Sequence, residues 1–385
     1  MSKRKILPGL ILALLLGAAG VWALLFGRGS FPAFNRYYQL DDYLQEFEQA
    51  LAQNLPFADE LSSLAVKLQM IGGAKELDGI YVGDEILVED IGQPIEELTQ
   101  RNIESLVAFS DQSRIPTYFM LLPTKCAIKQ SEIPQAAPLF NQRQFIEQTY
   151  NQLLGKATVV DVYPALFARF EEDLYYKTAP DLTALGDYCV YEVLAQRLDI
   201  TPRPQEDFDI QYVTHSYYGE TYQRSAYQDI SPDVIALYRY QKNNRTYSVT
   251  HSDGYAYTYD SLYPQQLMEL SEQPEDVLDV ILGGNTGDIT IRSNLKNENT
   301  LLIVGDDSIL PVIPFLAAHY SQIRFIDLEQ MSAEEIEKID CSDYQRMLIS
   351  YSVDTFIHQD VVQKVVYLNT QDQEEMKTIQ QAVQP

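Results

Sequence analysis

The sequence of 385 residues is poor in basic side chains, histidine and tryptophan. It has 28 lysines and arginines against 55 aspartates and glutamates, so its formal net charge at pH 7 is −27. No basic stretch follows the first few residues, which excludes a nucleic-acid-binding protein because an acidic surface repels phosphates. The 4 histidines leave little room for a histidine-rich metal centre. We predict no metal site and no cofactor.

Cysteine is also scarce. Cys126, Cys189 and Cys341 lie far apart in the chain and lack C-x-x-C spacing. Three thiols permit one disulfide at most, and we predict that they are buried and free. In an exported protein the odd count leaves pairing between chains as the alternative.

One uncharged segment, residues 6–27, is long enough to cross a membrane. As a helix it would extend about 33 Å, at roughly 1.5 Å per residue, which matches a bilayer core. Lys3, Arg4 and Lys5 precede it and an acidic chain follows, so the start is expected in the cytoplasm and the body outside. We predict a single-pass anchor in residues 1–28. A cleaved signal peptide is the alternative, although no clear cleavage site follows the apolar run.

Beyond the anchor, the pattern predicts a helical stalk and then an α/β body. In residues 29–75, apolar side chains recur at helical spacing between 39 and 70. Short apolar runs then alternate with helical patterns, which favours a parallel sheet flanked by helices. Ligands bind such sheets beyond the carboxyl ends of strands, here the loops after Leu122, Val162 and Val304. The predicted strands are 117–122, 157–162, 300–304, 323–327 and 347–350, and the predicted helices include 145–154 and 182–198.

A tyrosine-rich segment, residues 207–263, interrupts this alternation and separates 76–206 from 264–369. Its alternating pattern predicts a small antiparallel β insert, and the Asp-Gly pair in HSDGY predicts a tight hairpin turn. The tyrosines can stack on sugar rings, but aromatic residues also suit half-buried strands, and we favour packing. Residues 370–385 form a polar tail.

Three motifs in the body resemble the DHHW family of bacterial surface proteins. They are YYKTAPDLTALGDY at 175–188, Gly-Gly-Asn at 283–285, and the segment LLIVGDDSILPVIPFL that begins at Leu301 and continues through DYQRMLISYSVDTF. The DHHW family is similar to SGNH-type hydrolases and to the alginate acetylation proteins. Weaker similarities occur at 54–61, 75–90 and 121–125.

The resemblance implies an SGNH-hydrolase-like fold with a serine esterase or acetyltransferase site. A serine hydroxyl needs a neighbouring imidazole to take its proton, and a carboxylate to orient that imidazole. The oxyanion needs hydrogen-bond donors, which an asparagine side chain can provide. By this resemblance, Asn285 is expected to line the cleft.

The sequence departs from the family at each catalytic position. Against the family motif T-D-H-H-W-T, the chain has TAPDLT, so Ala179 replaces the orienting aspartate and Asp181 replaces the base histidine. Pro180 stands at the first histidine, and Asp307 stands at the nucleophile. Ser308, one residue later, is the alternative nucleophile.

The replacements leave two interpretations of the acidic residues. Asp181 and Asp307 would face each other across the cleft, where paired carboxyl groups can transfer protons or bind a cation. The structural alternative, which we favour, makes Asp181 the N-cap of the helix at 182–198 and places Asp307 at the start of a helix. Asp306 then has a turn or capping role. The cleft candidates are Asp181, Asn285, Asp306, Asp307 and Ser308.

Taken together, the residues predict a membrane-anchored, extracytoplasmic protein that has lost its reaction. Its cleft or tyrosine-rich segment would bind a cell-surface glycan or an envelope assembly partner. The alternative is an active carbohydrate esterase or O-acetyltransferase with a rearranged site at Ser308. A surface scaffold without a ligand is a third possibility.

Overall fold

The computed structural model of the chain describes residues 58–135, 137–240, 242, 244–263 and 278–368. The predicted anchor, the first part of the predicted stalk and the polar tail lie outside the described residues. The chain divides into two compact units, one of residues 1–74 with 226–229 and one of the remaining residues. Among the helices that the structure describes, none has both the length and the apolar character needed to cross a bilayer.

In the first unit, the described part of the predicted stalk is the helix α3, Ala58–Ile71. It ends where Gly72 donates its N–H to the Leu68 carbonyl at 3.0 Å, and Gly73 adopts a positive φ of 90°. Leu64, Leu68 and Ile71 are exposed along it.

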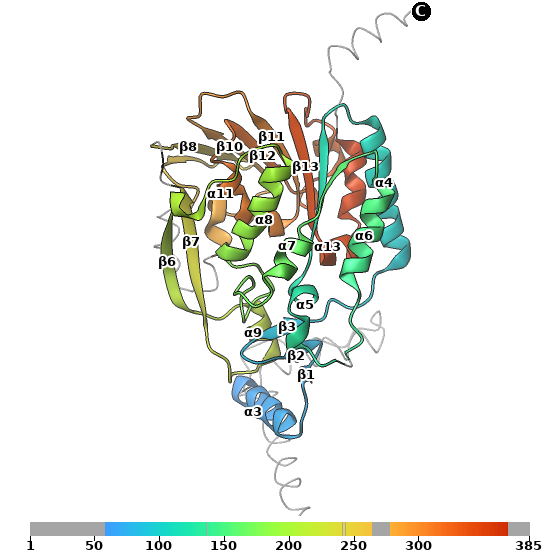
Figure 1. Cartoon of the computed structure of the whole chain (residues 1–385), viewed down its shortest axis with the longest axis vertical. Helices are drawn as coiled ribbons and strands as arrows, with labels where there is room; N and C mark the ends of the chain where they lie inside the picture. Colours follow the sequence, from blue (N-terminus) through green and yellow to red (C-terminus); the bar gives the residue numbers. More distant parts are fainter. Residues whose placement is uncertain (1–57, 136, 241, 243, 264–277, 369–385) are drawn as a thin grey trace, which may run out of the picture. The chain divides into compact units, whose positions relative to one another are not determined.

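In the second unit, eight strands form a central sheet in the order β5-β4-β13-β11-β12-β10-β8-β9 (Figure 1). The strands from β5 to β12 are parallel and confirm the predicted strands. Every residue of β4 is buried, as expected for a parallel strand with both faces covered. The bounds are β4 Thr117–Leu122, β5 Thr158–Val160, β11 Thr300–Gly305, β12 Gln322–Ile326 and β13 Arg346–Ser352.

The tyrosine-rich segment differs from the prediction in its second half. Only β6, Phe208–Tyr217, and β7, Asp233–Tyr240, form a separate antiparallel pair. The strands β8, Tyr247–His251, and β9, Ala256–Tyr259, instead extend the central sheet. They do so because β10, Asp288–Ser293, pairs antiparallel with β12 and leaves its other edge to β8. The central sheet is therefore mixed and not purely parallel.

Within this segment the predicted hairpin turn is confirmed, and six of the tyrosines are buried as packing predicts, whereas Tyr212 and Tyr255 are exposed. At HSDGY, His251 donates its N–H to the Tyr255 carbonyl at 2.8 Å, and Gly254 has a φ of 85°. A positive φ is favourable only for glycine and a few polar residues. The buried tyrosines of the segment are Tyr217, Tyr238, Tyr240, Tyr247, Tyr257 and Tyr263.

Helices flank the central sheet (Figure 1). The longer ones are α4 Glu96–Gln112, α6 Gln142–Gln152 and α8 Ala184–Arg197. The shorter ones are α5 Lys125–Ile128, α7 Tyr163–Ala168, α9 Glu220–Ser225, α11 Ile313–Leu316, α12 Ala333–Ile336 and α13 Val353–His358. The 3₁₀ helices are η1 Gln130–Glu132, η2 Gln205–Asp207, η4 Leu278–Gly283, η5 Asp307–Val312 and η6 Val361–Tyr367. A small separate sheet contains β1 Glu76–Leu77, β2 Ile80–Val82 and β3 Leu87–Glu89.

The three cysteines lie in this second unit. Cys126, Cys189 and Cys341 are buried and free, which confirms the prediction from their spacing.

Candidate binding pocket

A hairpin at residues 175–182 carries the first motif. Tyr175 and Leu182 form an antiparallel bridge, and the Tyr176 N–H donates to the Asp181 carbonyl at 3.0 Å. These contacts fold the segment back on itself immediately before α8. Asp181 therefore belongs to the hairpin and not to the helix.

The first turn of α8 is capped by a different residue from the one predicted. Thr183 accepts the Gly186 N–H on its side-chain oxygen at 3.3 Å, so Thr183 is the N-cap. The prediction that Asp181 caps this helix is wrong, because the backbone bond from Tyr176 holds Asp181 in the hairpin and the helix begins only at Ala184. The Asp181 side chain is left to line the pocket beside α8.

A buried lysine holds the hairpin from inside. Lys125 follows β4, is only 2% exposed, and donates from Nζ to the carbonyls of Tyr176 at 3.0 Å and Ala179 at 2.5 Å. Burial lowers the pKa of Lys125 to about 8, although Asp233 and other acidic groups favour its charged form. The ammonium group thus donates hydrogen bonds to two carbonyl oxygens that would otherwise be buried without a donor.

A buried carboxylate holds the same hairpin from β7. Asp233 accepts the N–H groups of Lys177 at 2.7 Å and Thr178 at 2.8 Å, and the Thr178 hydroxyl at 2.5 Å. The hairpin is therefore fixed on two sides. Ala179, at the position of the family's aspartate, is buried. It packs so closely on Gly219 that a Cβ on that glycine would lie 2.5 Å from the Ala179 Cβ.

Asp187, in the first turn of α8, is a site residue that we did not predict. It is 4% exposed, and its Oδ1 has no hydrogen-bond partner among the described residues. Burial, with a smaller contribution from Asp181, raises the pKa of Asp187 well above its usual value. The sequence signal was a single acid in the otherwise largely apolar first half of a strong helix.

Asp181 lies at the pocket wall and is exposed to solvent. Desolvation of its carboxyl group by neighbouring protein atoms raises the pKa of Asp181 to about 6, against the opposing charge of Lys125. Asp181 and Asp187 therefore differ in how readily they ionise near neutral pH.

The turn after β11 positions the second group of predicted residues. Asp306 caps η5, accepting the Ser308 N–H at 3.3 Å, and its other oxygen accepts the Ser352 N–H at 2.9 Å. This confirms the capping role of Asp306. The Ser308 hydroxyl also donates to Asp306. Neither Asp306 nor Ser308 is among the described residues that line the pocket.

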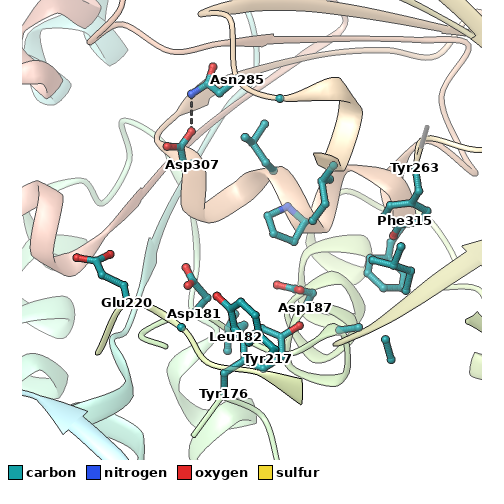
Figure 2. A pocket seen from close by; sticks show the side chains of 18 of the residues that line it. Tyr176, Asp181, Leu182, Asp187, Tyr217, Glu220, Tyr263, Asn285, Asp307 and Phe315 are labelled. Carbon is teal, nitrogen blue, oxygen red and sulfur yellow. Dashed lines mark hydrogen bonds between the residues drawn. The ribbon is translucent and has the colours of Figure 1, made fainter. Parts of the chain in front are cut away.

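Asn285 connects two carboxyl groups at the sheet edge. Its side-chain amide donates to Asp307 (Figure 2). The amide also donates to Asp327 at 2.8 Å, and its oxygen accepts the Gly287 N–H at 2.9 Å. Burial raises the pKa of Asp327, while the bond from Asn285 opposes that rise. The amide is thereby oriented toward carboxylates and has little freedom to serve another acceptor.

These elements enclose a pocket of about 720 Å³. Figure 2 shows Asn285 and Asp307 on one side of the pocket and Asp181 on the other. The structure thus brings together three of the five cleft candidates. Glu220, from α9, also lines it, and nothing in the sequence pointed to this residue. The aromatic lining residues are Tyr176, Tyr217, Tyr263 and Phe315, and the other polar ones include Gln223 and Gln330.

No histidine is among the described residues that line this pocket. His251 contacts the Thr286 hydroxyl at 3.0 Å, and His319 contacts the Tyr191 hydroxyl at 2.7 Å. His358 contacts Asp354 at 2.8 Å. His215 stacks on the Tyr212 ring with centroids 5.8 Å apart. In the described part of the chain, no group of three or more histidine, cysteine or acidic side chains is arranged to hold a metal ion.

A central sheet flanked by helices, with its pocket at the carboxyl ends of the parallel strands, fits an SGNH-like α/β fold. A DHHW family protein from Eubacterium siraeum has a similar structure, with a TM-score of 0.62 and 17% identity, over 77% of this chain and 98% of that one. Bacillus cereus PatB1 is also similar, with a TM-score of 0.57 and 14% identity, over 73% of this chain and 98% of PatB1. PatB1 with a sulfonyl adduct gives the same TM-score of 0.57.

At these identities the similarity shows a shared fold, and at that level the resemblance seen in the sequence is confirmed. No protein-family model and no curated protein matches the sequence.

Proposed function

We propose that this chain is a catalytically inactive relative of SGNH-type esterases whose pocket binds a cell-surface glycan. The position of the Ser308 hydroxyl carries the proposal. That hydroxyl donates to the capping residue Asp306, and Ser308 does not line the pocket. The position that aligns with the family's nucleophile holds Asp307, which cannot form an acyl-serine intermediate.

The remaining catalytic positions support the same proposal. The base position holds Asp181, and the orienting position holds the buried Ala179. Each of the four histidines has a partner elsewhere in the fold. A serine without an imidazole to accept its proton is a poor nucleophile, so this arrangement favours binding over acyl transfer.

The composition of the pocket supports a carbohydrate ligand. Tyr176, Tyr217 and Phe315 are among the lining residues, together with carboxyl and amide groups. Flat aromatic rings can cover the apolar face of a sugar, while polar groups bind its hydroxyls. A volume of about 720 Å³ falls within the usual range of ligand pockets.

The proposal includes attachment to the cell membrane with the body outside the cytoplasm. It rests on the uncharged segment 6–27 and the basic residues before it. Fractionation of cells that express the chain, followed by protease treatment of intact cells, tests it. We expect the chain in the membrane fraction and digestion of its body from outside. A soluble intracellular chain would contradict this part of the proposal.

Loss of catalysis is tested on the purified full chain with a chromogenic acetate ester and a fluorescent sulfonyl fluoride. We expect neither turnover above buffer nor covalent labelling. Turnover or labelling that disappears in Ser308→Ala would overturn the proposal and favour the alternative, an esterase or O-acetyltransferase with a rearranged serine site.

Glycan binding is tested by retention on cell-wall polysaccharide immobilised in an affinity gel. We expect Tyr217→Ala to lose retention and Tyr212→Ala to keep it, because Tyr217 lines the pocket and Tyr212 is 64% exposed elsewhere. Circular dichroism verifies that both variants fold. Failure of the wild type to bind any wall glycan would contradict the proposal and favour an envelope protein partner.

A further inference from the structure

The pocket has an unbalanced charge. Asp181, Asp187, Glu220 and Asp307 line it, and no lysine, arginine or histidine is among its described lining residues. A pocket lined by charges of one sign attracts ligands of the opposite sign and repels those of the same sign. Phosphate-bearing or uronic-acid glycans are therefore poor ligands for this pocket.

The acidic lining contains a buried oxygen without a hydrogen-bond partner among the described residues. Asp187 is 4% exposed, and its Oδ1 accepts no hydrogen bond from the described residues. An unsatisfied buried carboxyl oxygen destabilises a fold, and native proteins tolerate few of them. Because Asp187 also lines the pocket, a ligand in the pocket can supply the missing donor.

We propose that the pocket takes a saccharide with a free amino group, and that Asp187 accepts a hydrogen bond from its ammonium group. This inference rests on the proposed glycan-binding function and further specifies that the glycan carries a positive charge. An ammonium group has three N–H donors and no acceptor, which matches a lining rich in carboxyl oxygens.

The aromatic side chains favour a sugar ring over a bare cation. Tyr176 and Tyr217 lie edge to face, with centroids 5.7 Å apart, and both line the pocket near Asp181 (Figure 2). With Leu182, Leu310 and Pro311 they give the pocket an apolar lining, which an inorganic ion does not use. A sugar that carries an amine can contact both the rings and the carboxyl groups.

Binding of such a ligand is coupled to proton release. The charged and titratable groups that face Asp187 are Asp181 in the hairpin, Tyr175 and Tyr176 before it, and Tyr263. None of these supplies a positive charge, and burial favours the protonated form of Asp187 in the free protein. An ammonium group beside the carboxyl group favours ionisation, and the proton leaves to solvent while the amine keeps its own.

Isothermal titration calorimetry of the full chain in mild detergent tests the inference. The ligands are a β-1,4-linked glucosamine oligomer and its fully N-acetylated counterpart, which differ only in the amine. Titrations at about pH 6, where the amine is charged, in two buffers of different ionisation enthalpy give the number of protons released. The variants are Asp187→Asn and, as a matched control on the exposed face of α4, Glu104→Gln.

We expect the wild type to bind the glucosamine oligomer at least about tenfold more tightly than the acetylated one, with proton release. Asp187→Asn should lose the preference and lower the proton release, while Glu104→Gln keeps both. Asp181→Asn provides a second variant that retains Asp187 and should weaken the preference.

Three results would overturn the inference. Equal binding of the two oligomers would refute the amine preference but leave the glycan-binding function intact. Binding of neither oligomer nor of any wall glycan would contradict both. Binding of calcium chloride alone, lost in Asp187→Asn and without any amine preference, would assign the carboxyl groups to a metal ion.

Discussion

Carboxyl groups at three positions decide the chemistry of the pocket. Asp307 accepts a hydrogen bond from Asn285 and has a fixed neighbour. Asp181 sits in a wall where reduced hydration raises its pKa to about 6. Asp187 is buried more completely, and one of its oxygens has no donor in the described part of the chain. Burial raises the pKa values of both Asp181 and Asp187, because each carboxyl group loses hydration in the fold.

Asp187 gives stability an unusual pH dependence. Its pKa in the folded chain is raised well above the usual value, so the folded state favours the protonated form. The stability linked to this group is present below its unfolded pKa of about 3.9 and is lost as pH rises through the folded pKa. Asp187→Asn removes this pH-dependent loss of stability, because asparagine does not ionise. We expect the variant to exceed the wild type by about 1–3 kcal/mol at about pH 8, and by less at about pH 5.

Urea unfolding of both chains at the two pH values measures the difference. Glu104→Gln, which removes an exposed carboxyl group, should follow the wild type at both. A variant less stable than the wild type at the higher pH would mean that Asp187 is charged and has a partner in the folded chain.

Among the elements, the hairpin at 175–182 matters most because it presents Asp181 to the pocket and precedes α8. Lys125 donates to two of its carbonyls, at Tyr176 and Ala179. A second buried lysine, Lys129, makes the same kind of contact with the carbonyls of residues 170 and 172, at 2.6 and 2.8 Å. The two lysines thus form a natural pair for comparison, since only one holds a pocket element.

Replacement of each lysine by methionine separates stability from binding. Lys125→Met leaves two carbonyls without a donor, and we expect it to cost about 2–4 kcal/mol in urea unfolding. Lys129→Met leaves one, because the Glu172 carbonyl also accepts the Leu174 N–H at 2.8 Å, and should cost about 1–3 kcal/mol. Only Lys125→Met should also weaken retention on the polysaccharide gel, because only the hairpin at 175–182 lines the pocket. Equal loss of retention in both variants, measured while both are folded, would mean that the hairpin does not position the binding residues.

The sequence predicted elements well where burial alone determines them. The run at 117–122 is apolar throughout and became β4 with the predicted bounds, because a strand covered on both faces needs no polar alternation. Prediction from the sequence failed where a single long-range contact determines which element forms. Whether Tyr247–His251 joins the central sheet depends on β10, which is distant in the chain. The cap at Thr183 depends on a backbone bond across the hairpin, from Tyr176 to Asp181.

The candidate site follows the same rule. Asp181, Asn285 and Asp307 were found because motifs mark them, and they do share the pocket. Asp187 and Glu220 were missed because their importance comes from burial and proximity, which spacing along the chain does not encode.

For the whole molecule, the net charge of −27 acts on stability as well as on ligand choice. Like charges repel one another more strongly in the compact state than in the extended chain. The repulsion is screened by salt, with a Debye length of about 10 Å at 0.1 M. It also vanishes near the isoelectric point of about 4.4, where the chain carries no net charge.

We therefore expect sodium chloride to stabilise the full chain at neutral pH, raising the melting temperature by a few degrees between about 10 mM and about 300 mM. Differential scanning calorimetry at pH 7 measures the shift. The same salt series near the isoelectric point is the internal control, because screening has no net repulsion to relieve there and the melting temperature should stay level. If salt lowered the melting temperature at pH 7, attractive pairs such as Arg324 with Asp288, whose closest atoms are 2.6 Å apart, would dominate over the net charge.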